Sequence, residues 1–333
     1  MVPSAYLQRA PDEEPSDSGQ RGLALRYFAE SLNSTEFGLY YVKYHSRTPV
    51  FSVRKRDAAT NSGPYYFFDY PEGIEVFATS FNTTLAGWAV SGELSYRPHM
   101  PLSINTTDML QPLVSASAIW SPMAPTVQGA PAGADILGYQ ELEFTQLQFS
   151  FVKFFDRVLG ASRLSLVSEI GFDWIGSLPD VEEGGVRFER SPAFGTYFDG
   201  TVQVPVLGTP IAATCNNFVS PLGASHPNIN PDNCTSDGYL TDFAWGYRMR
   251  ASLEYPDVFA GVTLKPGLAW SHDVQGWAPA PNFNEGSKAT SLTLDAEYLS
   301  NYTASVSYTN FDGGDFNPLR DRDFYSLSFG VSF

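Results

Sequence analysis

Hydrophobic and polar residues alternate along the segment Asp242–Tyr255, which is about 14 residues long. Side chains of a β-strand point alternately to its two faces, so this pattern predicts a strand with one apolar and one polar face. A strand of this length is longer than the ~5–6 residues common in soluble proteins. The apolar face would carry Phe243, Trp245, Tyr247, Met249, Ala251, Leu253 and Tyr255.

The same alternation recurs along most of the chain and predicts about eleven strands. Clear examples are Trp88–Arg97, Arg163–Trp174, Val262–Val274, Leu292–Tyr298 and Asp323–Phe333. Weaker ones are Leu23–Glu30, Glu36–Tyr44, Ile74–Phe81, Tyr139–Val152 and Tyr302–Phe311. The pattern does not assign faces for Glu36–Tyr44 or Ile74–Phe81. A change of phase near Thr145 predicts a β-bulge there.

The links between these strands alternate between short and long. Short links occupy residues 31–35, 82–87, 155–161, 256–261 and 299–302. Long links occupy residues 45–73, 98–138, 176–241, 276–288 and 312–322. Outer-membrane barrels have short periplasmic turns and long outer loops, whereas Greek-key sandwiches do not sort their loops in this way. The fold class expected is therefore all-β, an antiparallel up-and-down transmembrane β-barrel.

Two features indicate that the apolar face meets lipid. Aromatic residues gather near strand ends, as in the girdles of membrane barrels, and ionisable residues lie on the opposite face at mid-strand. That face would line a polar lumen, with Arg248, Arg250, Glu254, Lys265, Asp273, Glu169, Asp173, Asp295 and Glu297 as lining candidates. These residues either orient and filter cargo, or form ion pairs that fill and rigidify the lumen.

Composition and the N-terminal sequence narrow the choice further. The net charge of −16 argues against nucleic acid as a partner, because phosphates require Lys and Arg. The chain has no apolar run of about 18 residues and no signal-peptide pattern at its start. Residues 1–333 are expected to form one barrel domain, with 1–22 as an outer loop and strands in 23–333. An odd strand count beginning on the outer side predicts an N-terminally truncated larger barrel, or else a miscounted first strand.

The two cysteines, Cys215 and Cys234, flank one Pro/Asn/Gly-rich stretch. We expect a disulfide that staples a long loop in an oxidising compartment, the alternative being two free thiols. A zinc site is not expected, because His226 is the one histidine nearby and four ligands are typical.

No sequence pattern of an enzyme is present. The chain lacks GxGxxG, Walker, HExxH and CxxC motifs. Ser271 and His272 are adjacent, but neighbouring strand residues face opposite sides and cannot pair as a nucleophile and its base. The acidic stretch Asp312–Asp323 lacks the spacing of a calcium loop and is expected to be a solvated outer loop. No catalytic residue, cofactor or metal is therefore expected.

Three segments resemble one family, the proteobacterial outer-membrane proteins filed as domain of unknown function 1302. They are Glu14–Phe28, Phe77–Asn105 and Asp257–Phe333, while the loop 176–241 matches least. The family is similar to long-chain fatty-acid channels, which implies hydrophobic or lipid-like cargo. It also implies partners: outer-membrane lipids, the outer-membrane assembly machinery reading the terminal Phe333, an envelope lipid-binding protein and an inner-membrane transporter.

The sequence is compatible with three candidate functions. The leading one is a channel for hydrophobic or amphipathic molecules in the outer membrane of a Gram-negative bacterium. A general polar porin is the second, and a soluble all-β carbohydrate-binding module is the third. Because one fold hosts many functions, the resemblance alone does not choose among them.

Overall fold

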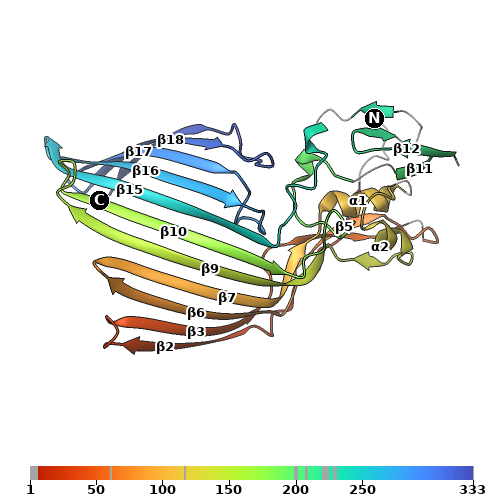
Figure 1. Ribbon diagram of the computed structural model, residues 1–333, viewed down its shortest axis with the longest axis horizontal. Helices are drawn as coiled ribbons and strands as arrows, with labels where there is room; N and C mark the ends of the chain where they lie inside the picture. The colour runs from red at the N-terminus through yellow and green to blue at the C-terminus, as the bar shows by residue number, and fades with distance from the viewer. Residues whose placement is uncertain are drawn as a thin grey trace.

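Strands dominate the computed structural model, which describes residues 7–60, 62–115, 118–198, 202–206, 209–219, 225–227 and 231–332. Eleven of them form one antiparallel sheet in which chain neighbours are also spatial neighbours (Figure 1). In order these are β2 (Arg21–Ala29), β3 (Thr35–Tyr44), β6 (Ile74–Leu85), β7 (Trp88–Ser103), β9 (Tyr139–Asp156), β10 (Arg163–Gly176), β15 (Phe243–Phe259), β16 (Val262–Gln275), β17 (Lys288–Tyr298), β18 (Tyr302–Asp312) and β19 (Phe324–Val331). This confirms the predicted all-β, antiparallel, up-and-down architecture.

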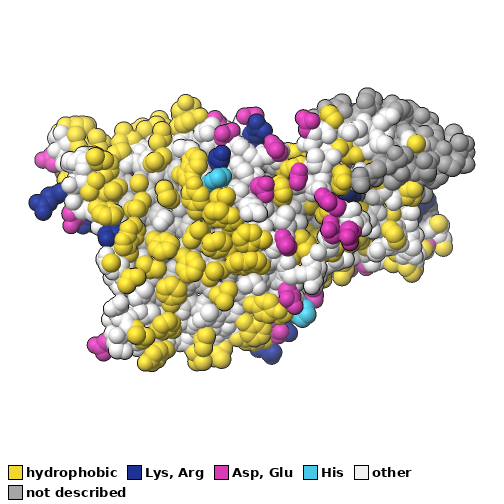
Figure 2. Space-filling model, viewed as in Figure 1, with side chains coloured by type: hydrophobic (Ala, Val, Ile, Leu, Met, Phe, Trp, Pro, Cys, Tyr) yellow, Lys and Arg dark blue, Asp and Glu magenta, His cyan; other side chains and the backbone are white. Residues whose placement is uncertain are grey.

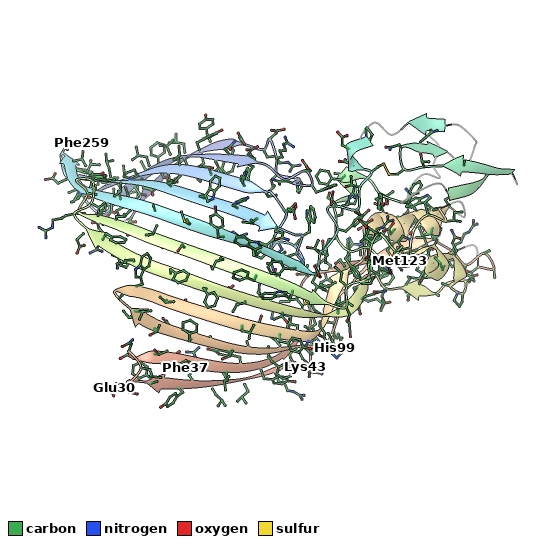
Figure 3. The ribbon with its side chains drawn as sticks, in the orientation of Figure 1. Glu30, Phe37, Lys43, His99, Met123 and Phe259 are labelled. Atoms are coloured by element: carbon green, nitrogen blue, oxygen red, sulfur yellow. A yellow bond between two sulfur atoms is a disulfide. The ribbon has the colours of Figure 1, made fainter. Side chains whose placement is uncertain are left out.

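The predicted alternation of short and long links also holds. Two of the short turns contain just two residues, Ala86–Gly87 and Ala260–Gly261, and all four residues have positive φ. Such turns match the right-handed twist of the strands that they join. Glu30 and Phe259 lie at this turn end of the sheet, whereas Met123 lies beyond the opposite end (Figure 3).

The sheet is open. β2 and β19 form its two edges, and no described segment pairs with the outer edge of either strand. Residues 7–20 lie beyond the other end of the sheet, where β1 (Gln8–Arg9) pairs with β5 (Tyr65–Asp69). His45 holds this N-terminal segment, because its Nε2 lies 2.7 Å from the carbonyl oxygen of Ser18.

Hydrogen-bond register settles the faces that the sequence left open. Leu23 lies opposite Tyr41, Tyr41 opposite Phe77, and Phe77 opposite Tyr96. Directly opposed residues share a face, so the apolar residues of β3 and β6 continue the apolar face of β7. Hydrophobic side chains cover this face of the sheet (Figure 2). They are exposed: Leu292 retains 55% and Phe329 76% of its accessible surface.

The bulge expected at Thr145 is not there. β9 pairs with β10 in uniform register, and the extra residue lies in β7, between Arg97 and Met100. The change of phase in β9 has another cause. Phe144 lies on the polar face of the sheet, but it is buried in a hydrophobic core that covers this face at the end of β9.

That core lies between the ends of β7, β9 and β10 and a second unit, here called the cap, formed by the described residues within 7–20, 45–73, 104–138 and 177–242. Its four-stranded sheet has the order β1-β5-β4-β8, with β4 (Val50–Arg54) and β8 (Asp135–Ile136). The cap also contains two helices, α1 (Thr106–Val114) and α2 (Ala124–Gly129), and short 3-10 turns at Pro192–Phe194 and Pro231–Asn233. Two further antiparallel strand pairs complete it: β11 (Val202–Val206) with β12 (Thr209–Ala213), and β13 (Asn217–Val219) with β14 (Ser225–Pro227). In the described residues neither helix is long and apolar enough to cross a bilayer.

A buried ion pair joins α1 to the long segment 177–242. Arg187 Nε donates to Asp108 Oδ2 at 2.7 Å, and both side chains are almost fully buried. Asn105 supports the same junction: its Oδ1 accepts from the amides of Thr107 and Asp108, and its Nδ2 donates to the carbonyl oxygen of Glu189 at 2.7 Å. The cap is thus fixed by polar contacts between segments about 80 residues apart.

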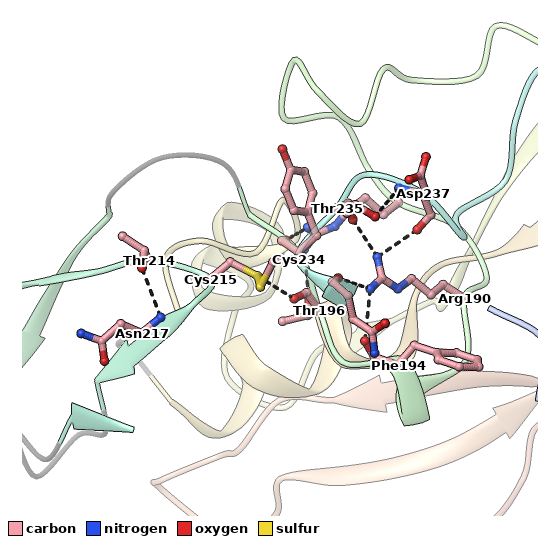
Figure 4. The surroundings of a disulfide bond; sticks show 12 residues. Arg190, Phe194, Thr196, Thr214, Cys215, Asn217, Cys234, Thr235 and Asp237 are labelled. Atoms are coloured by element: carbon pink, nitrogen blue, oxygen red, sulfur yellow. Dashed lines mark hydrogen bonds between the residues drawn. A yellow bond between two sulfur atoms is a disulfide. The ribbon is translucent and has the colours of Figure 1, made fainter. Parts of the chain in front are cut away.

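The predicted disulfide between Cys215 and Cys234 is present, with its Cα atoms 5.8 Å apart. It lies in the cap beside the backbone carbonyls that bind Arg190 (Figure 4). Arg190 donates to the carbonyl oxygens of Thr235 and Asp237, both at 2.9 Å, next to Cys234 in the chain. The disulfide and Arg190 therefore both hold residues 233–237 against other parts of the same 177–242 segment.

Removing one partner of the buried ion pair is expected to loosen the cap. Asp108→Ala leaves the Arg187 guanidinium buried without its counter-ion, which costs about 3–5 kcal/mol. Hydrogen exchange at the amides of Met109, within α1, and Ser115, directly after it, would measure the loss of protection. Asp12→Ala, which removes the half-buried partner of the exposed Arg9, is the control and is expected to leave α1 protection unchanged. Unchanged α1 protection in Asp108→Ala would contradict the role given to this pair.

Candidate functional site

The register of the large sheet places all nine predicted lining residues on the face opposite the apolar one. On β10 and β15, Glu169 lies opposite Arg248, and Arg163, next to the hairpin turn, lies opposite Glu254. On β16 and β17, Lys265 lies opposite Asp295. Each of these residues alternates with the exposed apolar side chains of its own strand. The sequence therefore predicted the sidedness of this polar face correctly.

The structure brings these residues together in two groups. Lys265 Nζ lies 2.9 Å from Glu297 Oε2 and opposite Asp295, nearer the Ala260–Gly261 turn. Arg248 Nη2 lies 3.9 Å from Asp273 Oδ1, nearer the cap. Glu254 lies near enough to the first group for its charge to act on Lys265, whereas Arg250 lies opposite the apolar residues Val167 and Ala269. Ion pairing, the alternative to cargo filtering, thus accounts for part of the polar face.

The link between β16 and β17 folds back over this face at the cap end. Its Phe283 is buried against two glycines, Gly171 and Gly246, which lie directly opposite each other on β10 and β15. A Cβ at Gly171 would lie 3.0 Å from Phe283 Cζ, and one at Gly246 would lie 2.9 Å from Phe283 Cδ1. The paired glycines therefore form a shallow depression that admits the Phe283 ring. We call residues 276–287 the inner loop.

Polar contacts from the lining candidates hold the inner loop in place. Asn282 Nδ2 donates to Asp173 Oδ2 at 2.8 Å, and Arg248 Nη2 donates to the Asn282 carbonyl oxygen at 3.4 Å. The amide of Asn284 donates to Asp273 Oδ2 at 3.0 Å. Three of the nine predicted residues, Asp173, Arg248 and Asp273, thus bind the inner loop.

A cavity of about 530 Å³ lies between the inner loop, the cap and the sheet. Arg248, Ser271 and Asp273 form part of its floor. Its other walls come from the cap, the inner loop, the end of β18 and the β18–β19 link, and include Ile104, Leu240, Trp277, Phe283, Phe311, Phe316 and Leu319. This mainly apolar lining with a few charged groups is typical of small-molecule sites.

Two consecutive cap residues add charge to the cavity wall. Arg190 is buried, and its two Nη atoms donate to four backbone carbonyls, those of Phe194, Asn233, Thr235 and Asp237. Its guanidinium also stacks on the Phe316 ring, 4.5 Å from the centroid. Glu189 has no such partners, and burial raises the pKa of its carboxyl to about 7.

Sequence reasoning missed Glu189, Arg190 and the inner loop, because loops carry no periodic signal. Two signals were present in the sequence: glycines at Gly171 and Gly246 inside strong strand patterns, and aromatic residues in the long link 276–288, which was expected to be an outer loop. A glycine inside a strand often marks the close approach of another group.

Other features considered from the sequence are the adjacent Ser271 and His272, the acidic stretch Asp312–Asp323, a metal site and the terminal Phe333. Ser271 lines the cavity, while His272 packs against Tyr247 on the apolar face, so the two do not form a catalytic pair. The acidic stretch Asp312–Asp323 is not the fully solvated loop expected, because its Phe316 is buried and lines the cavity, while Asp323 accepts hydrogen bonds from Tyr308 and Asn310. The described residues contain no group of three or more His, Cys, Asp or Glu side chains placed to hold a metal ion. Phe333, the expected assembly signal, lies outside the described residues.

The fold and the site define a class: an antiparallel meander with one exposed apolar face, one polar face and a cavity beneath a cap. The family model described as "Protein of unknown function (DUF1302)" matches residues 3–333, and the chain belongs to this family. No curated protein matches the chain. The resemblance found in the sequence is thereby confirmed at the level of the family.

Filling the glycine depression is expected to release the inner loop. Gly171→Val adds atoms where Phe283 packs, at a cost of about 1–3 kcal/mol, so the loop amides of Ala278 and Asn284 lose protection from hydrogen exchange. The matched control is Gly267→Val, on the same face of the sheet, where an added Cβ has no neighbour closer than 3.7 Å. The double variant Gly171→Val/Phe283→Ala removes the clash. Equal protection of the inner-loop amides in Gly171→Val and Gly267→Val would show that the glycine depression does not hold Phe283.

Proposed function

We propose that the large sheet is part of the wall of an outer-membrane β-barrel that conducts hydrophobic or amphipathic molecules. The observation that carries this proposal is that one face of the sheet is apolar and exposed whereas the other is polar and charged. Large side chains such as Leu25, Phe77 and Phe329 are exposed on one face, and an exposed apolar surface of this extent is typical of contact with a membrane or a partner. Strands of about 9–11 residues suffice to cross a bilayer, and β17 and β18 each contain 11.

Closure of the barrel is part of the proposal. The outer edges of β2 and β19 carry backbone groups that no described segment pairs. In hydrocarbon each unpaired group costs several kcal/mol, so membrane-spanning sheets close on themselves. We propose that further strands pair with these edges, and that the polar face then encloses the lumen.

The inner loop and the cavity support a selective channel rather than a wide pore. In a closed barrel the inner loop would lie inside the lumen near its outer mouth, with Phe283 against the wall. The cap would stand over that mouth. A mainly apolar cavity at this position suits amphipathic cargo, and an envelope lipid-binding protein and an inner-membrane transporter would then receive or supply it.

The charged polar face favours a second candidate, a general polar porin. Arg250 lies outside the two charged groups described above, and an aqueous channel would hydrate it. The two candidates differ in the role of the inner loop, which blocks a porin but selects cargo in the proposed channel.

One pair of adjacent substitutions tests the membrane assignment. Leu292→Arg puts a charge on the apolar face near the middle of β17, and Thr293→Arg puts the same charge on the polar face. In a bilayer the first is expected to cost about 2–4 kcal/mol and the second little. Urea titration of the chain refolded in phosphatidylcholine vesicles would measure both. Equal effects would exclude lipid contact at Leu292, and so would recovery of the unmodified protein in the soluble fraction without detergent.

Flux measurements test the cargo class. Vesicles containing the full-length protein are expected to take up fatty acids faster than sugars of similar mass, because the cavity wall is mainly apolar. Protein-free vesicles give the background for passive entry. Equal acceleration of both solutes, with large single-channel conductance, would instead establish the polar porin. Release of the inner loop by Gly171→Val is expected to raise conductance in either case.

A further inference from the structure

Glu189 is held at the cavity wall by its backbone. Its amide donates to the Ser103 carbonyl oxygen at 2.9 Å, and its own carbonyl accepts from Asn105 Nδ2 at 2.7 Å. These contacts anchor the residue at the junction between the cap and β7. Its side chain lines the cavity, where burial alone perturbs the carboxyl.

No cation of the described residues forms an ion pair with this carboxylate, since burial is the one cause of its raised pKa. Four other charged residues line the cavity: Arg190, Arg248, Asp273 and Lys288. The Nη atoms of Arg190 are bound to backbone carbonyls, and Arg248 faces Asp273 and the inner loop. Lys288 also lines the cavity, at the start of β17, and forms no ion pair with Glu189. Glu189 therefore faces the cavity as a desolvated acid without a counter-ion.

We propose that the cavity binds a compact organic cation with an apolar body, such as an arylalkyl ammonium, and that Glu189 is its counter-ion. A buried carboxylate is unfavourable unless it is paired, so a ligand that brings the positive charge removes this cost. The aromatic wall suits such a ligand, because Trp277 lines the same cavity and indole rings attract cations. The volume of about 530 Å³ is within the range of known small-molecule sites.

The inference rests on the proposed function in one respect, the assignment of this ligand as a cargo of the channel. Binding at the cavity does not itself require transport. An equilibrium binding experiment on the full chain in nonionic detergent therefore tests the site separately from the flux measurements. Loss of flux with binding retained would overturn the channel alone, and loss of binding with flux retained would overturn this inference alone.

Three probes that share a phenyl-ethyl body separate the possible head groups: phenethylammonium, 2-phenylethanol and 3-phenylpropionate. Calorimetric titration is expected to detect the ammonium as the tightest ligand. Glu189 with a pKa of about 7 is mostly protonated at pH 6 and mostly ionised at pH 8, whereas the amine keeps its proton at both. Because the cation binds the ionised form, its affinity is expected to rise about tenfold from pH 6 to pH 8.

Variants assign the effect to one residue. Glu189→Gln keeps the shape but removes the charge, so it is expected to weaken ammonium binding and abolish its pH dependence. Glu183→Gln, an exposed acid in the same segment, is the control and is expected to behave like the unmodified protein. If the ammonium affinity of Glu189→Gln still depended on pH, the titrating group would be Asp273, and the role of Glu189 would be overturned. Tighter binding of the alcohol or the carboxylate by the unmodified protein would overturn the cation specificity without any variant.

Discussion

The alternation of apolar and polar side chains along every long strand is the constraint on which the structure depends. Directly opposed residues share a face, so a consistent phase across eleven strands gives the whole sheet two unlike surfaces. The apolar surface has no protein layer over it in the described residues, and side chains such as Leu292 and Phe329 remain exposed. A sheet of this kind requires another apolar medium, and this requirement is the physical basis of the proposed membrane setting.

The polar surface is not uniform along the strands. Near the turn end it carries Lys265 and Glu297, which pair with each other. Near the cap it is covered, first by the inner loop and then by the hydrophobic core that includes Phe144 and Phe188. The charged residues there do two things at once, since Arg248 and Asp273 both line the cavity and hold the inner loop. The lining of the cavity and the position of the inner loop therefore depend on the same side chains.

The cap is built differently from the sheet. Its elements are short, and contacts between distant segments hold them: the Asp108–Arg187 pair, the bonds of Arg190 to four carbonyls, and the Cys215–Cys234 disulfide. This construction fixes Glu189 at the cavity wall although it belongs to no helix or strand. The site that carries the ligand proposal thus depends on the cap, and the sidedness of the sheet provides its floor.

The sequence by itself determined the eleven strands, their order, the sorting of short and long links, the disulfide and the face on which Arg248 or Lys265 lies. These features follow from local rules, because a period of two and a turn signal are readable within about ten residues. The bulge predicted at Thr145 was wrong because Phe144 is buried by the cap, a contact that no local pattern records. Three features were decided by the tertiary structure alone: the hydrophobic core under the cap, the packing of Phe283 on Gly171 and Gly246, and the lack of an ion pair at Glu189. Each of these depends on residues far apart in the chain that meet only after folding.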